Sequence, residues 1–112
     1  SLHDALPIYQ ARRWFLTAEP IEAQKACQIG LVHEVVTPDI LDETVGTVVT
    51  ALLKAGPKAL VAAKKLIAEQ SGQNLHAIKK RTAELIAKLR VSPEGQEGLS
   101  AFLEKRPPDW NK

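Results

Sequence analysis

One short β-rich segment stands alone among helix-forming sequence, and it constrains the fold more than any other feature. Residues 31–36 (LVHEVV) contain three valines and leave no room for a helix before Pro38. A strand by itself leaves its backbone N–H and C=O groups unpaired, and the sequence contains no second convincing strand. We therefore predict one short strand near residues 32–36, and we expect its partner strand to belong to sequence outside these residues.

Most of the remaining sequence has the apolar period of amphipathic helices. One face of the clearest case carries Leu41, Val45, Val48, Val49, Leu52 and Leu53. Gly30 and Gly72 favour helix C-termini, whereas Asn74 and Ser92 favour N-caps. The predicted helices cover residues 10–16, 22–28, 41–55, 57–71, 75–90 and 93–105. The side chains expected to point inward from helix 57–71 are Leu60, Ala63, Leu66 and Ile67. The predicted fold class is mainly α.

The length of the chain allows one domain, and its single cysteine favours a reducing compartment. It has 112 residues, of which 45% are hydrophobic and 25% charged, with a net charge of +2. It begins with serine and has no methionine, so we expect a piece of a longer protein. One cysteine cannot form an internal disulfide, and no apolar run approaches the length of a membrane span. We expect a bacterial, cytoplasmic protein that binds neither membrane nor nucleic acid.

No metal site or catalytic motif stands out. Cys27, His33 and His76 have no partners at metal-ligand spacing, and the glycines form no phosphate-binding loop. The serine in Gly98-Leu99-Ser100 lies within a predicted helix rather than after a strand, which excludes a nucleophile elbow. We predict no metal ligand and no catalytic residue in this chain.

Two pairs of carboxylates could in principle serve acid–base chemistry. Glu19 with Glu22, and Glu94 with Glu97, fall in turns or in the first turns of predicted helices. Acidic side chains stabilise the N-terminal ends of helices, so we interpret both pairs as structural.

Two neighbouring predicted helices are strongly basic. Their cations are Lys58, Lys64, Lys65, Lys79, Lys80, Arg81, Lys88 and Arg90. Nucleic acid, an anionic cofactor and a solvated surface are three interpretations of this pattern. No aromatic residue interleaves these cations, as single-stranded nucleic acid would favour, and the solvated surface is the ordinary state of any single lysine.

Three segments together resemble the C-terminal part of the crotonase family, the enoyl-CoA hydratases and isomerases. They are residues 11–17 (ARRWFLT) with the following Ile-Glu-Ala, residues 29–36 (IGLVHEVV) and residues 92–110 (SPEGQEGLSAFLEKRPPDW). The resemblance extends from Tyr9 to the C-terminus. One departure is Ala18, where the family usually has glycine, and we expect the loss of glycine to alter that turn slightly.

The resemblance implies a fold and a reaction. The chain would be the helical C-terminal part of a crotonase ββα-spiral fold, with residues 9–36 ending the core and residues 37–112 forming a C-terminal helical oligomerisation domain. Residues 1–8 fit neither part, and we interpret them as a non-native or disordered leader. The family acts on acyl-CoA thioesters. It holds the thioester oxygen on two backbone N–H groups, and in hydratases two glutamates assist the addition of water to the 2,3 double bond. Those groups match no position here, so we expect this chain alone to be inactive.

The resemblance also implies a small coenzyme-binding site. In the family, a phenylalanine and a lysine of the last helix contact the adenine end of CoA, and the matching positions are Phe102 and Lys105. Their i, i+3 spacing would put both on one helix face. CoA is part of the substrate, so no separate cofactor is expected, and the family forms trimers or pairs of trimers. Hydratase is the preferred activity, including hydratases of fatty acid and branched-chain amino acid degradation. Isomerase, a nucleic-acid-binding module and an assembly element remain alternatives.

Overall fold

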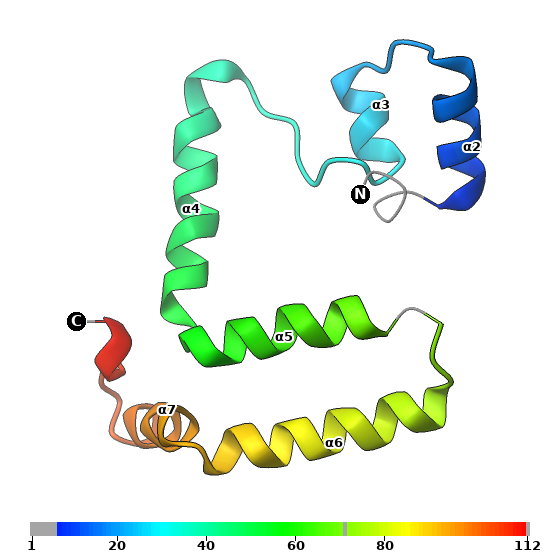
Figure 1. Cartoon of the computed structure of the whole chain (residues 1–112). Coiled ribbons are helices and arrows are strands. Elements are labelled where there is room, and N and C mark those ends of the chain that lie inside the picture. Colours follow the sequence, from blue (N-terminus) through cyan, green and yellow to red (C-terminus); the bar gives the residue numbers. More distant parts are fainter. Residues whose placement is uncertain (1–6, 71, 112) are drawn as a thin grey trace. The chain divides into compact units, whose positions relative to one another are not determined.

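The computed structural model describes residues 7–70 and 72–111 and confirms the mainly α fold (Figure 1). Its helices are α2 (Ile8–Thr17), α3 (Ala23–Gln28), α4 (Leu41–Lys54), α5 (Pro57–Glu69), α6 (Leu75–Val91) and α7 (Pro93–Leu103), with single 3₁₀ turns at Pro38–Ile40 and Asp109–Asn111. The chain divides into two compact units, Ser1–Thr44 and Val45–Lys112. The leader predicted for residues 1–8 lies mostly outside the described residues, although Ile8 already belongs to α2.

The predicted strand near residues 32–36 is wrong. No residue in the described part of the chain is in a strand, and the segment instead leaves α3 through bends and irregular backbone. The backbone N–H groups of Leu31 and Val32 donate to the carbonyl of Ala26, at 2.9 and 3.4 Å. Valine-rich sequence favours extended backbone, but a strand forms only where a second segment supplies the hydrogen-bonding ladder. The described residues supply none.

The first unit has a small core between α2 and α3. Ala11 and Ile29 are buried, and Trp14, Ile21 and Leu31 pack against them. The Trp14 indole N–H donates to the side-chain oxygen of Gln10 at 3.2 Å, which satisfies the polar end of a half-buried ring. The core is small because α3 has only six residues, so few side chains can meet there.

Helices α2 and α3 are each followed by a residue in the left-handed conformation. Gly30 follows α3 with φ +86°, as predicted for a glycine that closes a helix. Ala18 follows α2 with φ +52°, and its N–H donates to the Trp14 carbonyl at 3.2 Å. The turn is therefore kept without glycine, at a cost of about 1 kcal/mol for a residue with a Cβ.

In the second unit, α5 and α6 run in opposite directions beside each other, and α7 follows after a sharp corner (Figure 1). Asn74 caps α6 by accepting from the Ala77 N–H at 2.8 Å, as predicted. The corner between α6 and α7 is very tight at Gly95. A Cβ there would lie 2.1 Å from the carbonyl oxygen of Leu89, so only glycine fits.

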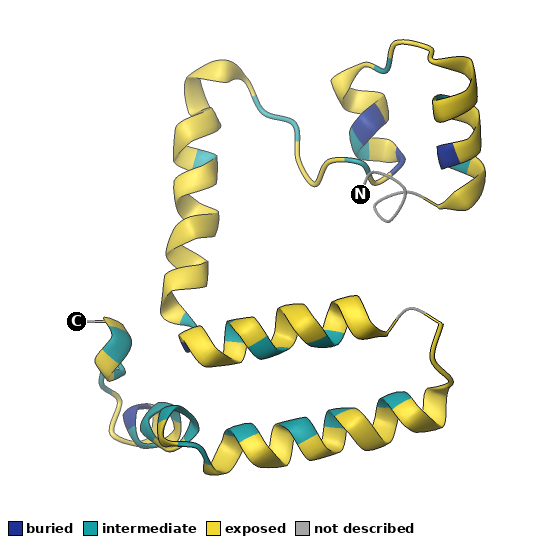
Figure 2. Cartoon of the chain, in the orientation of Figure 1, coloured by how far each residue is buried: buried dark blue, intermediate teal, exposed yellow. Residues whose placement is uncertain are grey.

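Much of the predicted inward surface is exposed. On α5, Leu60 and Leu66 are half-buried as predicted, but Ala63 and Ile67 are exposed, so that part of the prediction is wrong. Half-buried residues of α5 and α6 lie on the sides that face each other (Figure 2). On α4, the whole predicted apolar face is exposed. A periodic apolar face indicates that a helix needs a partner surface, but it does not show that the partner is in the same segment.

Among the described residues, no single helix is long and apolar enough to cross a membrane. Only the sharply bent pair Pro38–Lys54 and Pro57–Glu69 reaches the required length and hydropathy, by composition alone.

Candidate functional site

The candidate site lies at the C-terminal end of α7, which carries Phe102 and is followed by Lys105. Ser92 caps the helix, as predicted, because its hydroxyl accepts from the Gly95 N–H at 3.1 Å. Pro93 occupies the first turn, where its missing N–H costs little. The start of α7 is therefore fixed by its own sequence.

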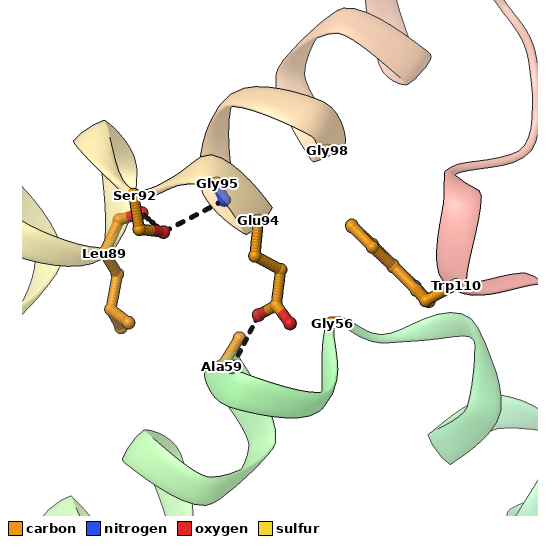
Figure 3. Close-up of a pocket in the computed structure, with 8 residues that line it drawn as sticks. All are labelled: Gly56, Ala59, Leu89, Ser92, Glu94, Gly95, Gly98 and Trp110. Atoms are coloured by element: carbon orange, nitrogen blue, oxygen red, sulfur yellow. Dashed lines mark hydrogen bonds between the residues drawn. The ribbon is translucent and has the colours of Figure 1, made fainter.

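Glu94 joins the start of α7 to the start of α5. Its two carboxylate oxygens accept from the backbone N–H groups of Lys58 and Ala59, at 3.0 and 2.9 Å. Figure 3 shows the bond from Ala59. A negative charge at this position also interacts favourably with the α5 dipole. The prediction of a structural role for Glu94 was correct, but the N–H groups it satisfies belong to a helix 35 residues earlier in the sequence. Gly56 permits the approach, because a Cβ there would lie 2.7 Å from the Glu94 carboxylate.

Trp110 packs over the same junction. Its indole N–H donates to the Lys54 carbonyl at 3.2 Å, and its ring lies 3.3 Å from the position that a Cβ on Gly98 would occupy. A hollow of about 200 Å³ lies between the ring and the corner, lined mainly by small residues and by Glu94 (Figure 3). Because both oxygens of Glu94 are already bonded, we interpret this junction as a mechanical link that holds α7 against α5.

Beyond the helix, Arg106 folds back onto α7. Its guanidinium donates to both oxygens of Glu97, at 2.5 and 3.2 Å, and to Glu104 at 2.7 Å. The Asp109 N–H also donates to Glu97, at 3.1 Å. The hydrogen bond from Arg106 holds the pKa of Glu97 below its usual value, against a smaller opposing effect of desolvation, while the same bond raises the pKa of Arg106. This arrangement, the Arg106 clasp, fixes the backbone that follows α7.

Phe102 and Lys105 lie on either side of the helix end. The Phe102 side chain is 80% exposed, so it does not pack into a core within the described part of the chain. Lys105 is also exposed, in the left-handed conformation with φ +53°. Its N–H donates to the Phe102 carbonyl at 3.3 Å, and the Arg106 N–H donates to the Ala101 carbonyl at 3.0 Å.

The expectation that Phe102 and Lys105 share one helix face is wrong. The helix ends at Leu103, two residues before the predicted end, because the left-handed residue at 105 reverses the chain. Helical spacing therefore predicts the position of the Phe102 side chain, which lies within α7. The position of Lys105 depends instead on the turn after the helix and on the Arg106 clasp. The pairing of Glu97 with Arg106, nine residues apart, was not predicted. An acid on the last helix and an arginine just past its end could have indicated it.

The remaining candidates form no site. The half-buried Cys27 thiol donates to the His33 carbonyl at 3.6 Å, and the ring of His33 takes no part in that contact. Of the pair Glu19 and Glu22, Glu19 pairs with Arg13 at 3.4 Å. No group of three or more metal-ligating side chains occurs in the described ranges.

The whole chain matches a known family model. Residues 1–112 match the model described as enoyl-CoA hydratase/isomerase. The chain belongs to the enoyl-CoA hydratase/isomerase family. The expected resemblance, and the expected helical part of a crotonase fold, are thereby confirmed.

Relatives within this family carry both activities in their names. The chain is 34% identical to the 2,3-dehydroadipyl-CoA hydratase of Escherichia coli over 100 residues, which is 89% of this chain and 39% of that protein. It is 28% identical to the trans-2-decenoyl-[acyl-carrier-protein] isomerase of Streptococcus mutans, over 95% of this chain and 40% of the isomerase. The crystal structure of an enoyl-CoA hydratase from Shewanella pealeana superposes with a TM-score of 0.88 at 39% identity, covering 96% of this chain and 40% of that one. The chain thus spans about two fifths of the length of these relatives.

Proposed function

We propose that this chain contributes the adenine-binding end of an acyl-CoA site in an enoyl-CoA hydratase. The observation that carries the proposal is the end of α7, where an aromatic ring that is 80% exposed precedes a lysine held in the left-handed conformation. An exposed ring offers a stacking surface to a purine, and an ammonium group offers charge to a phosphate. A left-handed lysine costs about 1 kcal/mol or more, and strained backbone of this kind clusters at functional sites.

The expected reaction is the addition of water to the 2,3 double bond of an acyl-CoA. The resemblance of residues 92–110 to hydratases supports hydratase over isomerase, and so does the name of the Escherichia coli relative. The isomerase remains a second candidate because a relative of that name matches over almost the whole chain. A full-length enzyme that hydrates crotonyl-CoA, but does not shift the double bond of a 3-enoyl-CoA, would favour hydratase, and the reverse result would favour isomerase.

The coenzyme role of Phe102 and Lys105 can be tested on this chain. We expect CoA to perturb the amide resonances of residues at the end of α7 in an NMR titration. Phe102→Ala and Lys105→Gln should each weaken the binding about fivefold to tenfold, the effect of losing one stacked ring or one phosphate contact. The control is Phe15→Ala, since Phe15 is the chain's other phenylalanine and is also exposed. Equal losses in the control, or binding that ignores both α7 variants, would contradict the proposal.

The catalytic groups belong, by this proposal, to other parts of the parent enzyme. The isolated chain should therefore show no hydration of crotonyl-CoA above the uncatalysed rate in a spectrophotometric assay. Turnover by the purified chain would show that catalytic residues lie within it.

The parent enzyme is expected to form trimers or hexamers. The exposed apolar face of α4, with Val45, Val48 and Leu52 about half exposed, supports association with another protein surface. We expect the isolated chain to self-associate in size-exclusion chromatography, and a stable monomer that unfolds cooperatively would count against this.

A further inference from the structure

The basic helices α5 and α6 carry a groove that the coenzyme site does not use. The groove has a volume of about 250 Å³. Its floor is apolar and includes Leu66, Leu85 and Leu89, and its cations are Lys58, Lys65, Arg81 and Lys88. The structure thus separates the eight cations of these helices into four that line the groove and four that do not.

The four groove cations face one another in two opposed pairs. Lys58 and Lys65 are seven residues apart on α5, and Arg81 and Lys88 are seven apart on α6, so each pair lies on one helix face. Because the helices run in opposite directions (Figure 1), Lys58 lies at the same end of the groove as Lys88, and Lys65 at the same end as Arg81.

The two ends of the groove differ in ion pairing. Arg81 pairs with Glu69, which neutralises that end in part. At the other end, no acidic side chain within the described ranges pairs with Lys58 or Lys88, and the carboxylate of Glu94 is bonded to backbone N–H groups of α5. Two ammonium groups without an ion pair are therefore available to an anion at the Lys58–Lys88 end.

We propose that this groove binds a medium-chain fatty acid anion, with its carboxylate between Lys58 and Lys88 and its alkyl chain along the leucines toward Leu66. Charge complementarity selects an anionic head and the apolar floor selects a hydrocarbon tail. The volume selects a narrow ligand, because it is below the roughly 300–1,000 Å³ typical of pockets for drug-sized ligands, and a protein helix is about 10–12 Å across. The proposal does not depend on the CoA site, which lies on α7.

The test is a titration of the chain with decanoate, below its micelle concentration, followed by amide NMR and calorimetry. We expect perturbations on α5 and α6 along the groove, and at least about fivefold weaker binding of 1-decanol, which has the same chain without the charge. Equal affinity for decanol, or perturbations confined to α4 or to the first unit, would overturn the proposal.

Paired variants separate the groove from general positive charge. The double variant Lys58→Gln/Lys88→Gln should weaken decanoate binding about tenfold. Lys64→Gln/Lys79→Gln removes the same charge from the same helices outside the groove and should change the affinity less than twofold. Equal losses in the two variants would show non-specific attraction and overturn the proposal.

A third experiment tests whether the groove binds a protein helix instead of a fatty acid. An amphipathic helical peptide rich in glutamate should bind more weakly than decanoate and should not be displaced by it. Tighter binding of the peptide at the same amides would show that the groove is a protein-docking surface and would overturn the fatty-acid assignment. CoA binding at the end of α7 would be unaffected by either result, so failure here leaves the proposed function standing.

Discussion

Helices α3 and α7 end with the same hydrogen-bond pattern but with different residues at the reversal. After α3, the N–H groups of Gly30 and Leu31 donate to the carbonyls of Cys27 and Ala26, at 3.1 and 2.9 Å. After α7, Lys105 and Arg106 make the corresponding bonds at 3.3 and 3.0 Å. Both reversals need a left-handed residue, with φ +86° at Gly30 and +53° at Lys105.

The comparison of the two helix ends shows what stabilises a residue other than glycine at positive φ. Glycine adopts positive φ at no steric cost, so the end of α3 needs little other support. At Lys105 the Cβ makes the left-handed conformation sterically unfavourable. The end of α7 is accordingly held by the Arg106 clasp and by the hydrogen bond of Trp110. We interpret the lysine as kept for its charge rather than for its backbone preference.

The largest effect is expected at the glycine end. Gly30→Ala should destabilise the first unit by about 1–2 kcal/mol, because it imposes the steric cost of a left-handed Cβ where no clasp offsets it. The chain has one tryptophan in each unit, Trp14 and Trp110. Urea unfolding followed by fluorescence in a Trp110→Phe background would report on the first unit alone. An unchanged midpoint would show that this reversal does not depend on glycine.

The converse change at α7 should act in the opposite direction. Lys105→Gly should stabilise the second unit by about 0.5–1 kcal/mol, because glycine removes the left-handed strain, and it should weaken CoA binding by removing the ammonium group. Unfolding followed by Trp110 in a Trp14→Phe background gives the stability, and the CoA titration gives the affinity. Lys105→Gln removes the charge but keeps the Cβ and is the matched control. It should lower the affinity for CoA without stabilising the second unit. A gain in both stability and affinity would contradict a coenzyme role for Lys105.

Ala18 gives a smaller, internal check of the same idea. Ala18→Gly should stabilise the first unit by at most about 1 kcal/mol, since the turn after α2 already has φ +52°. Its urea midpoint should rise while CoA affinity stays constant, because Ala18 is in the other unit. A fall in stability would show that the greater freedom of glycine in the unfolded chain outweighs the strain.

The clasp itself should show as a small pH dependence. Arg106 holds the pKa of Glu97 below its unfolded value, so the carboxylate contributes stability above the unfolded pKa, and this contribution is lost as the pH falls through the folded pKa. Glu97→Gln should therefore reduce stability near neutral pH, and the difference from wild type should shrink in acid. The urea midpoints of wild type and Glu97→Gln, measured between pH 7 and pH 3, give this difference in stability. A difference that stays constant with pH would mean that Glu97 acts through packing rather than charge.

Local features of this chain could be predicted from its sequence. The helices, the caps at Asn74 and Ser92, and the glycine after α3 at Gly30 follow from interactions within three or four residues. The helix predicted to run to residue 71 ends earlier, at Glu69. The family could also be predicted, because three segments, the last of them residues 92–110, together resemble the crotonase family.

Only the tertiary structure decided the contacts that reach across the chain. The two N–H groups bonded to Glu94, the bond from Trp110 to Lys54 and the division of the basic residues between groove and solvent depend on how distant segments meet. The strand prediction was wrong for the same reason, because valines specify a preference for extended backbone but not a neighbour. Local hydrogen bonds are encoded by adjacent residues, whereas long-range pairing depends on the whole path of the chain.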